Sequence, residues 1–192
     1  VSESYLYQHK TAKSVFPRMT YDLMKKHFVG EHIFALSSCI YGEIPELILN
    51  GKYDEAKEKA LFYRSMFGDG NFYLELQNHN LPEEQQVLPY LIQISRETGI
   101  PVVATNDVHY VEKSDARIRD MVVAMRLNVA ITDENFERDC GELYIKSYEE
   151  MLEIFKEIPE AVHNTVKIAE QCNIEFKKEK RFPKYIVPEG KS

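Results

Sequence analysis

The chain has 192 residues and is 44% hydrophobic and 29% charged, a balance that favours a globular protein and argues against disorder. No stretch approaches the roughly 18 continuous apolar residues of a membrane span, and a net charge of −7 gives no support for a surface that binds nucleic acid directly. Three widely separated cysteines without a CxxC motif argue against a disulfide framework or a zinc ribbon and suit a reducing cytoplasm. Because the chain opens on Val1 and not on Met, we expect it to be a piece of a longer protein.

Three short runs predict buried parallel strands. Each is rich in β-branched or aromatic residues and ends in small or polar ones. They cover residues 32–39, 71–78 and 101–107.

Helical patterns separate these runs. A short helix is expected to reach Leu49, a second to run over 53–67 with Gly68 as its C-cap, and a third to cover 82–99. Pro89 falls inside the third pattern, where we expect it to kink the helix or to reset its first turn. Strands and helices thus alternate as in right-handed βαβ units, which predicts an α/β fold with a parallel sheet.

The pattern changes after Tyr110. Ser114 or Asp115 is a predicted N-cap for the helical stretch that follows, and Ser147 with Glu150 forms a capping box that opens another helix. In chain order we expect a helix over 114–128, an irregular loop over 127–142, a short strand and a helix within 143–155, a final helix that begins near Pro159, and a linker or extended segment over 181–192.

Asp107 and His109 stand two positions apart where the third predicted strand ends. Residues i and i+2 of a strand point to the same face, and parallel α/β folds bind ligands at the carboxyl ends of their strands. A carboxylate and an imidazole suit Zn²⁺, Mn²⁺ or Fe²⁺. The two residues by themselves leave an alternative open, in which Asp107 caps a turn or the next helix and His109 packs beside Tyr110.

Four other residues are candidates for the same rim of the sheet. Cys39 ends the first predicted strand, where a thiolate could bind a metal, although a cysteine is more often a small buried hydrophobe. His79 follows the middle strand in a sequence that also fits an ordinary turn. Glu43 and Glu75 could add rim carboxylates, but Glu43 could equally complement the dipole of a helix start. The sequence contains no P-loop, no GxGxxG, no nucleophile elbow and no DxD pair.

Three stretches, taken in order, resemble one family. They read "FALSSCIYGEIPELILNGKYDEA", "NFYLELQNHNLPEEQQVLPYLIQISRETGIPVVATNDVHYVEKSDA" and "EEMLEIFKEIPEAVHNTVKIAEQCNIEF". They are similar to the amino-terminal PHP (polymerase and histidinol phosphatase) domain of bacterial DNA polymerase III α subunits, and the similarity is continuous from about residue 31 to 190. The closing "RFPKYIVPEG" resembles the connection from that domain into the polymerase body.

The resemblance implies the C-terminal portion of a distorted, TIM-like β/α barrel of the PHP type, followed by helices and a linker. The implied division of the chain is a loosely similar N-terminal segment at 1–30, a partial PHP barrel at 31–126, the end of the PHP domain at 127–180, and a linker toward the polymerase body at 181–192.

The resemblance also implies a metal cluster at the rim of that barrel. By position, Cys39, Asp107 and His109 match the last metal-binding residues of the family, and the earlier ones, including a His-x-His motif, are expected upstream of Val1. The sequence departs from the family at Arg119, where a His is common, and in the loop that follows, but neither departure touches the three matched residues.

For function, the resemblance implies that the parent protein is a DNA-directed DNA polymerase of DNA replication. We expect Zn, Mn or Fe in its PHP site and Mg at a polymerase site outside this chain. A metal-dependent 3′–5′ exonuclease or pyrophosphatase activity is the catalytic expectation for the PHP site. Two alternatives stay open, a structural scaffold that braces the polymerase and binds the proofreading subunit, and a free-standing PHP phosphoesterase.

The same resemblance sets the expected partners. DNA, deoxynucleotides and other polymerase III subunits would meet the parent polymerase in the cytoplasm, without a membrane. The 192 residues alone are predicted to be inactive as a polymerase, and their unpaired strand edges make self-association an expected behaviour.

Overall fold

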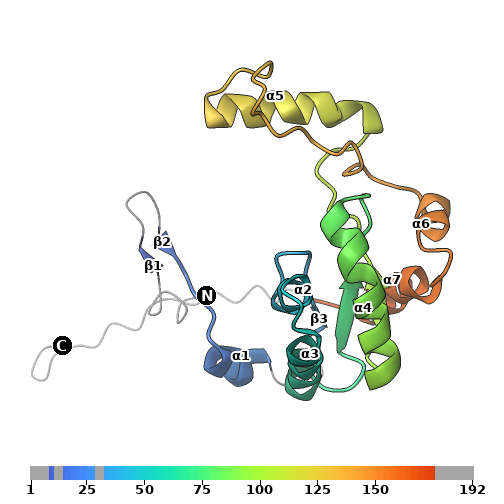
Figure 1. Ribbon diagram of the computed structural model, residues 1–192. Coiled ribbons are helices and arrows are strands. Elements are labelled where there is room, and N and C mark those ends of the chain that lie inside the picture. Colours follow the sequence, from blue (N-terminus) through green and yellow to red (C-terminus); the bar gives the residue numbers. More distant parts are fainter. Residues whose placement is uncertain (1–8, 11–14, 29–32, 176–192) are drawn as a thin grey trace, which may run out of the picture.

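A three-stranded parallel sheet lies at the centre of the computed structural model, which describes residues 9–10, 15–28 and 33–175 (Figure 1). The strands follow the order β3-β4-β5, and their bounds are β3 (Ala35–Leu36), β4 (Phe72–Leu76) and β5 (Val102–Ala104). Leu36 pairs with Tyr73 and Leu76 pairs with Ala104, both in parallel register. The predicted α/β class with a parallel sheet is therefore confirmed.

Helices join the strands and cover them. Their bounds are α1 (Tyr21–Phe28), α2 (Glu43–Leu49), α3 (Tyr53–Phe67), α4 (Pro82–Thr98), α5 (Ala116–Leu127), α6 (Tyr148–Ile154) and α7 (Glu160–Gln171). A short antiparallel pair, β1 (His9–Lys10) and β2 (Val15–Phe16), precedes α1. Figure 1 places α2, α3 and α4 together on one side of the strands and α6 and α7 on the other.

Local sequence signals set several of these helix ends. Gly99 ends α4 with φ 73, a left-handed conformation that glycine adopts without strain. The predicted capping box opens α6, since the amide of Glu150 donates to Ser147 Oγ at 3.2 Å and the amide of Ser147 donates to Glu150 Oε2 at 2.7 Å. The helix predicted after Ser114 begins at Ala116, preceded by a 3₁₀ turn over Lys113–Asp115.

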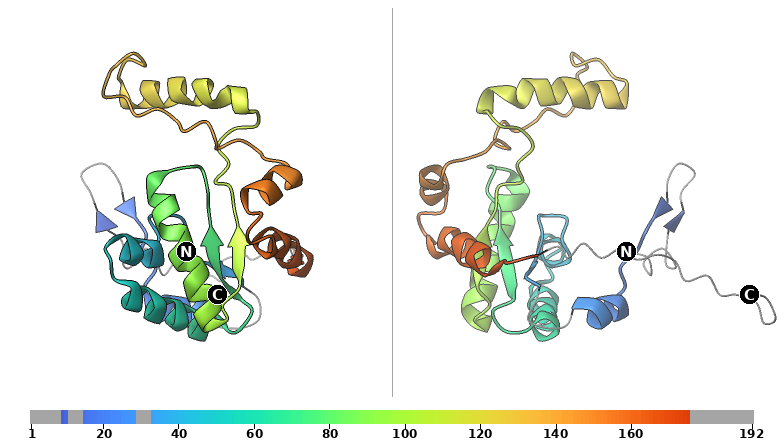
Figure 2. Two further views of the ribbon diagram at one scale, coloured as in Figure 1. Left: turned by 45° about the vertical axis from the view of Figure 1, so that its right-hand side comes forward. Right: turned by 180° about the vertical axis from the view of Figure 1, so that it is seen from behind.

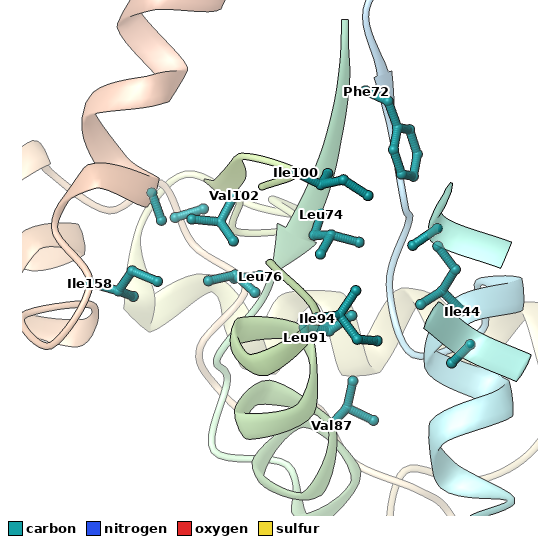
Figure 3. Close-up of a cluster of buried hydrophobic side chains, with 14 of the residues drawn as sticks. Ile44, Phe72, Leu74, Leu76, Val87, Leu91, Ile94, Ile100, Val102 and Ile158 are labelled. Atoms are coloured by element: carbon teal, nitrogen blue, oxygen red, sulfur yellow. The ribbon is translucent and has the colours of Figure 1, made fainter. Parts of the chain in front are cut away.

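The hydrophobic core lies where the strands meet the helices (Figure 3). Leu74 and Leu76 of β4 are fully buried, as are Ile94 of α4 and Ile44 of α2. On the β5 side, α7 packs against the strand, and the buried Asn164 donates through Nδ2 to the carbonyl of Val102 at 2.8 Å. That bond satisfies a strand carbonyl at the outer edge of the sheet, where no neighbouring strand is described.

Three predictions of strand structure are wrong in extent. The first run keeps strand pairing only at Ala35–Leu36, because Ser38 turns away with φ 70; the first residue of that run, His32, lies outside the described residues. The third run stops at Ala104, and the amide of Thr105 makes the last ladder bond, to Leu76 at 3.0 Å. The short strand expected within 143–147 is a single parallel bridge between Tyr110 and Tyr144.

Pro89 lies within α4, which runs without interruption from Pro82 to Thr98. The helix therefore does not restart at Pro89. Proline lacks an N–H, so the carbonyl of Gln85 loses its helical partner. Both residues are exposed, and water can bind that carbonyl instead.

Helix α5 projects away from the sheet, together with the loop that follows it (Figure 2). No helix in the described part of the chain is both long enough and apolar enough to cross a membrane. The predicted linker at 181–192 lies outside the described residues, as do residues 1–8, 11–14 and 29–30 of the N-terminal segment.

Candidate metal centre

The carboxyl ends of the three parallel strands meet around the side chain of Glu75 in β4. Its Oε2 accepts a hydrogen bond from the amide of Ser38 at 3.1 Å, and its Oε1 accepts one from Thr105 Oγ1 at 2.5 Å. The amide of Glu75 in turn donates to Ser37 Oγ at 2.8 Å. Glu75 thus joins the segment that precedes Cys39 to the segment that precedes Asp107.

Cys39 sits in a tight turn directly after β3. The amide of Gly42 donates to the carbonyl of Cys39 at 2.7 Å, which closes the turn. A Cβ at Gly42 would collide with the carbonyl oxygen of Ser37, so only glycine fits there. The half-buried thiol lines a cavity of about 10 Å³, the room of roughly one water molecule, together with Glu75 and Glu84.

Asp107 and His109 lie close together, but not for the reason that the sequence pattern suggested. The strand has ended at Ala104, and Asp107 adopts φ 34, so the two residues are joined by a turn. Asp107 Oδ2 lies 3.8 Å from His109 Nδ1, and the two side chains are 53% and 40% exposed. The amide of His109 donates to the carbonyl of Leu143 at 2.8 Å, which holds the turn from its outer side.

The imidazole of His109 is held by the backbone. Its Nδ1 lies 2.7 Å from the carbonyl oxygen of Asp107. A carbonyl can only accept a hydrogen bond, so this contact requires the proton on Nδ1 and selects the neutral tautomer that has its lone pair on Nε2. Metal-binding histidines are commonly oriented in this way, by donating the other ring N–H to a backbone carbonyl.

Two strained positions flank the candidate ligands. Ser38 at φ 70 directly precedes Cys39, and Asp107 itself has φ 34. Non-glycine residues rarely adopt a positive φ, and such conformations gather at functional sites. The strain therefore marks the same rim that the ligand pattern indicated.

His79 is buried and does not open onto the rim, being 3% exposed. Its Nδ1 lies 2.6 Å from Glu84 Oε1, and its amide donates to Glu84 Oε2 at 2.5 Å. Burial opposes the charge on each member, but their mutual hydrogen bonds outweigh it, so the pKa of His79 is raised and the pKa of Glu84 is lowered. The pair anchors the first turn of α4 to the end of β4.

Glu43 is the first residue of α2, as expected if its charge complements the dipole at the start of a helix. Its carboxylate accepts hydrogen bonds from Tyr63 at 2.6 Å and from Tyr21 at 2.8 Å, and it pairs with Lys59 at 2.9 Å. Burial raises the pKa of Glu43, but these hydrogen bonds outweigh burial and lower it. Glu43 therefore ties α1, α2 and α3 together, with its oxygens already engaged.

Apart from Glu75, which joins two strand ends, the predicted residues thus fall into separate groups. Asp107 and His109 are adjacent, Cys39 lies at the neighbouring strand end, and His79 and Glu43 have other partners. Among the residues that the structure describes, no three His, Cys, Asp or Glu side chains stand close enough together to hold a metal ion.

Two supporting residues escaped the sequence analysis. Asn106 donates through Nδ2 to the carbonyl of Tyr144 at 2.5 Å, and its Oδ1 accepts from Lys146 Nζ at 3.0 Å. The Lys146 side chain is buried, at 2% exposure, and pairs with Glu142 at 3.3 Å. These contacts bind the Asp107 turn to a segment about 40 residues later, and no pattern in the sequence announces such a distant contact.

Comparison with known proteins identifies the class first. Residues 1–79 match the PHP domain family. This match identifies the first 79 residues as PHP-domain sequence, and the parallel α/β sheet is consistent with that class of fold.

Three relatives of this chain share one name and so point to a particular family of PHP-containing proteins. The chain is 39% identical over 184 residues to DNA polymerase III subunit alpha of Deinococcus radiodurans, covering 92% of this chain and 14% of that protein. It is 41% identical over 174 residues to the same subunit of Borreliella burgdorferi, covering 90% of this chain and 15% of that protein. For Treponema pallidum the identity is 42% over 161 residues, with coverages of 82% and 13%. The chain belongs to the PHP-domain region of the DNA polymerase III alpha family, and it spans about 14% of the length of these curated relatives.

Proposed function

We propose that this chain is the C-terminal part of the PHP domain of a replicative DNA polymerase III α subunit, and that Cys39, Asp107 and His109 are metal ligands in the intact protein. The order β3-β4-β5, all parallel, with helices packed against the strands, is compatible with one arc of a β/α barrel. Residues upstream of Val1 would supply the remaining strands and the earlier ligands.

The observation that carries the proposal is the orientation of His109. The backbone carbonyl of Asp107 holds Nδ1–H, so Nε2 of the neutral ring keeps its lone pair, and the exposed Asp107 carboxylate lies 3.8 Å from Nδ1 of the same ring. A neutral imidazole nitrogen and a carboxylate oxygen suit Zn²⁺, Mn²⁺ or Fe²⁺, and the thiol of Cys39 adds a softer donor at the next strand end. The donor set therefore fits a divalent metal.

For the intact protein we propose metal-dependent phosphoester hydrolysis, as a 3′–5′ exonuclease or a pyrophosphatase. A bound divalent ion activates water and stabilises charge on phosphoryl oxygens. Within this chain, Cys39, Asp107 and His109 would hold the metal, while Glu75 keeps the two ligand-bearing segments at a fixed separation. DNA-directed polymerisation, with Mg, deoxynucleotides and the other subunits, would depend on parts of the polypeptide outside this chain. The net charge of −7 on this chain agrees with DNA binding to those other parts of the polypeptide.

A structural scaffold is the second candidate function, in which the domain braces the polymerase and binds a proofreading subunit without catalysis. One observation favours it. Both oxygens of Glu75 are engaged by protein donors, so this part of the rim is built for rigidity and not for binding a ligand.

Elemental analysis of the full-length polypeptide, purified without chelator, separates the two. We expect Zn, Mn or Fe in the unmodified protein and its loss in the triple variant Cys39→Ser, Asp107→Asn, His109→Ala. A matched control changes residues of the same types outside the rim, Cys172→Ser, Asp133→Asn and His163→Ala, all three exposed. Absence of metal from the unmodified protein, together with no chelator-sensitive release of 3′-terminal nucleotides, would rule out the catalytic function and leave the scaffold.

A further inference from the structure

Helix α5 carries an apolar stripe that faces solvent. We define the α5 stripe as Ile118, Met121, Val122 and Met125, at i, i+3, i+4 and i+7. Their exposed fractions are 58%, 40%, 60% and 79%. Such spacing in a helix is the usual mark of a face that packs against another surface.

The orientation of α5 is fixed by its opposite face. Asp120 and Ala124 are buried, and Asp120 Oδ1 accepts a hydrogen bond from the amide of Asp139 at 2.9 Å. Arg119 adds an ion pair with Asp139 at 2.7 Å. The loop after α5 therefore covers one face and leaves the α5 stripe outward, on the arm that projects from the sheet (Figure 1).

Two arginines border the stripe. At about 100° per residue, Arg117 and Arg126 lie on opposite flanks of the line through Ile118 and Met125. Both are exposed, and neither forms an ion pair with another residue in the part of the chain that the structure describes. A partner surface that is apolar at its centre and carries carboxylates along both edges would be complementary to this face.

A second copy of the chain is a poor occupant. The only carboxylate within α5 belongs to Asp120, which is buried, so a copy of the helix would offer no carboxylate to Arg117 or Arg126 in either a parallel or an antiparallel pairing. Such a pair would gather four arginines beside one apolar seam without an opposite charge, which is unfavourable.

Size points to a partner within the same polypeptide. The helix has 12 residues and is therefore roughly 18 Å long and about 10 Å wide, so its outward face offers on the order of 200 Å², compared with about 800 Å² per partner in a standard interface. Such a small patch holds a free partner weakly, whereas a covalently linked domain acts at an effective concentration of around millimolar. The curated relatives are far longer than this chain, which covers 14% of one and 15% of another.

We propose that the α5 stripe docks onto an apolar, carboxylate-edged surface of another domain of the same, longer polypeptide. This interface is independent of the metal centre. It would use α5 as a strut between the PHP part and a neighbouring domain.

Methionine oxidation tests the proposal, because Met125 is 79% exposed and Met66 is only 6% exposed in the core. Under limiting peroxide, Met125 in the isolated 192 residues should oxidise much faster than Met66. In the full-length polypeptide the difference between the two should be lost. Val122→Glu in the full-length polypeptide should restore fast oxidation of Met125, because it would place a carboxylate against the apolar centre of the partner surface. The matched control is Val166→Glu, a valine 49% exposed on α7, which should leave Met125 protected.

Two results would overturn the proposal. One is equal, fast oxidation of Met125 in both the isolated and the full-length protein. The other is concentration-dependent dimerisation of the isolated 192 residues in sedimentation, abolished by Val122→Glu, which would make a second copy the occupant.

Discussion

Glu75 Oε1 and the hydroxyl of Thr105 lie 2.5 Å apart, and this contact joins the central strand to the segment that leads into the Asp107 turn. The other carboxylate oxygen of Glu75 holds the amide of Ser38, next to Cys39. One side chain on β4 therefore sets the separation of both ligand-bearing segments.

Removing this side chain should loosen both segments. We expect Glu75→Ala to lower the free energy of unfolding by about 1–3 kcal/mol, because Ser38 N–H and Thr105 Oγ1 lose their acceptor. Combined with Thr105→Val in a double-mutant cycle, it should show a coupling of roughly 0.5–3 kcal/mol, since the residues contact each other. Urea denaturation of the parent protein, the two single variants and the double variant measures this coupling energy. Simple additivity would mean that the contact contributes nothing of its own.

The buried His79–Glu84 pair predicts a specific pH dependence. Because the pKa of His79 is raised in the folded protein, its protonation stabilises the fold fully below the ordinary histidine pKa of 6.5. This stabilisation is lost as the pH rises through the folded pKa. Because the pKa of Glu84 is lowered in the folded protein, its ionised form stabilises the fold fully above the ordinary glutamate pKa of 4.5. This stabilisation is lost as the pH falls through the folded pKa. The pair should therefore stabilise most between these two values.

The variant Glu84→Gln should flatten this dependence and lower the free energy of unfolding by roughly 3 kcal/mol near pH 6, because it leaves an unpaired buried histidine. Denaturation profiles from pH 4 to 9 provide the measurement. Glu83→Gln, one residue earlier and exposed, is the matched control and should keep the parent profile. A Glu84→Gln profile that is parallel to the parent's at every pH would contradict the assignment.

The turn that presents Cys39 depends on Gly42. Gly42→Ala places a methyl group against the carbonyl of Ser37, and we expect a loss of about 1–3 kcal/mol in unfolding free energy as the turn shifts. The reaction rate of Cys39 with a thiol reagent should change as well, while that of the exposed Cys172 should not. Unchanged stability and unchanged Cys39 reactivity would show that the turn tolerates a side chain.

Metal removal should destabilise the intact protein if the rim binds a metal. A ligand that binds only the folded state stabilises it by RT ln(1 + [L]/Kd), about 2.7 kcal/mol at a hundredfold excess over Kd. We expect a chelator to lower the thermal midpoint of the full-length polypeptide and to leave the midpoint of the Cys39→Ser, Asp107→Asn, His109→Ala variant unchanged. An equal effect of chelator on both proteins would place the metal elsewhere.

Elements whose signals are local could be predicted from the sequence. The bounds of α3, the end of α4 at Gly99 and the capping box of Ser147 with Glu150 were all predicted, because each depends on residues within about one helical turn. The family relation was also available from sequence, because it rests on the order and identity of residues along the chain.

How these elements present their side chains depends on contacts between distant parts of the chain. Asp107 and His109 are adjacent through a turn held by Leu143 and Lys146, and not through a strand. The sequence pattern suggested that His79 lies at the rim, whereas in the structure its Nδ1 contacts Glu84 in the core. The open face of α5 depends on a loop that covers the other face. Each of these outcomes rests on hydrogen bonds and packing between distant segments or across a turn, and the periodicity of the sequence carries no record of such contacts.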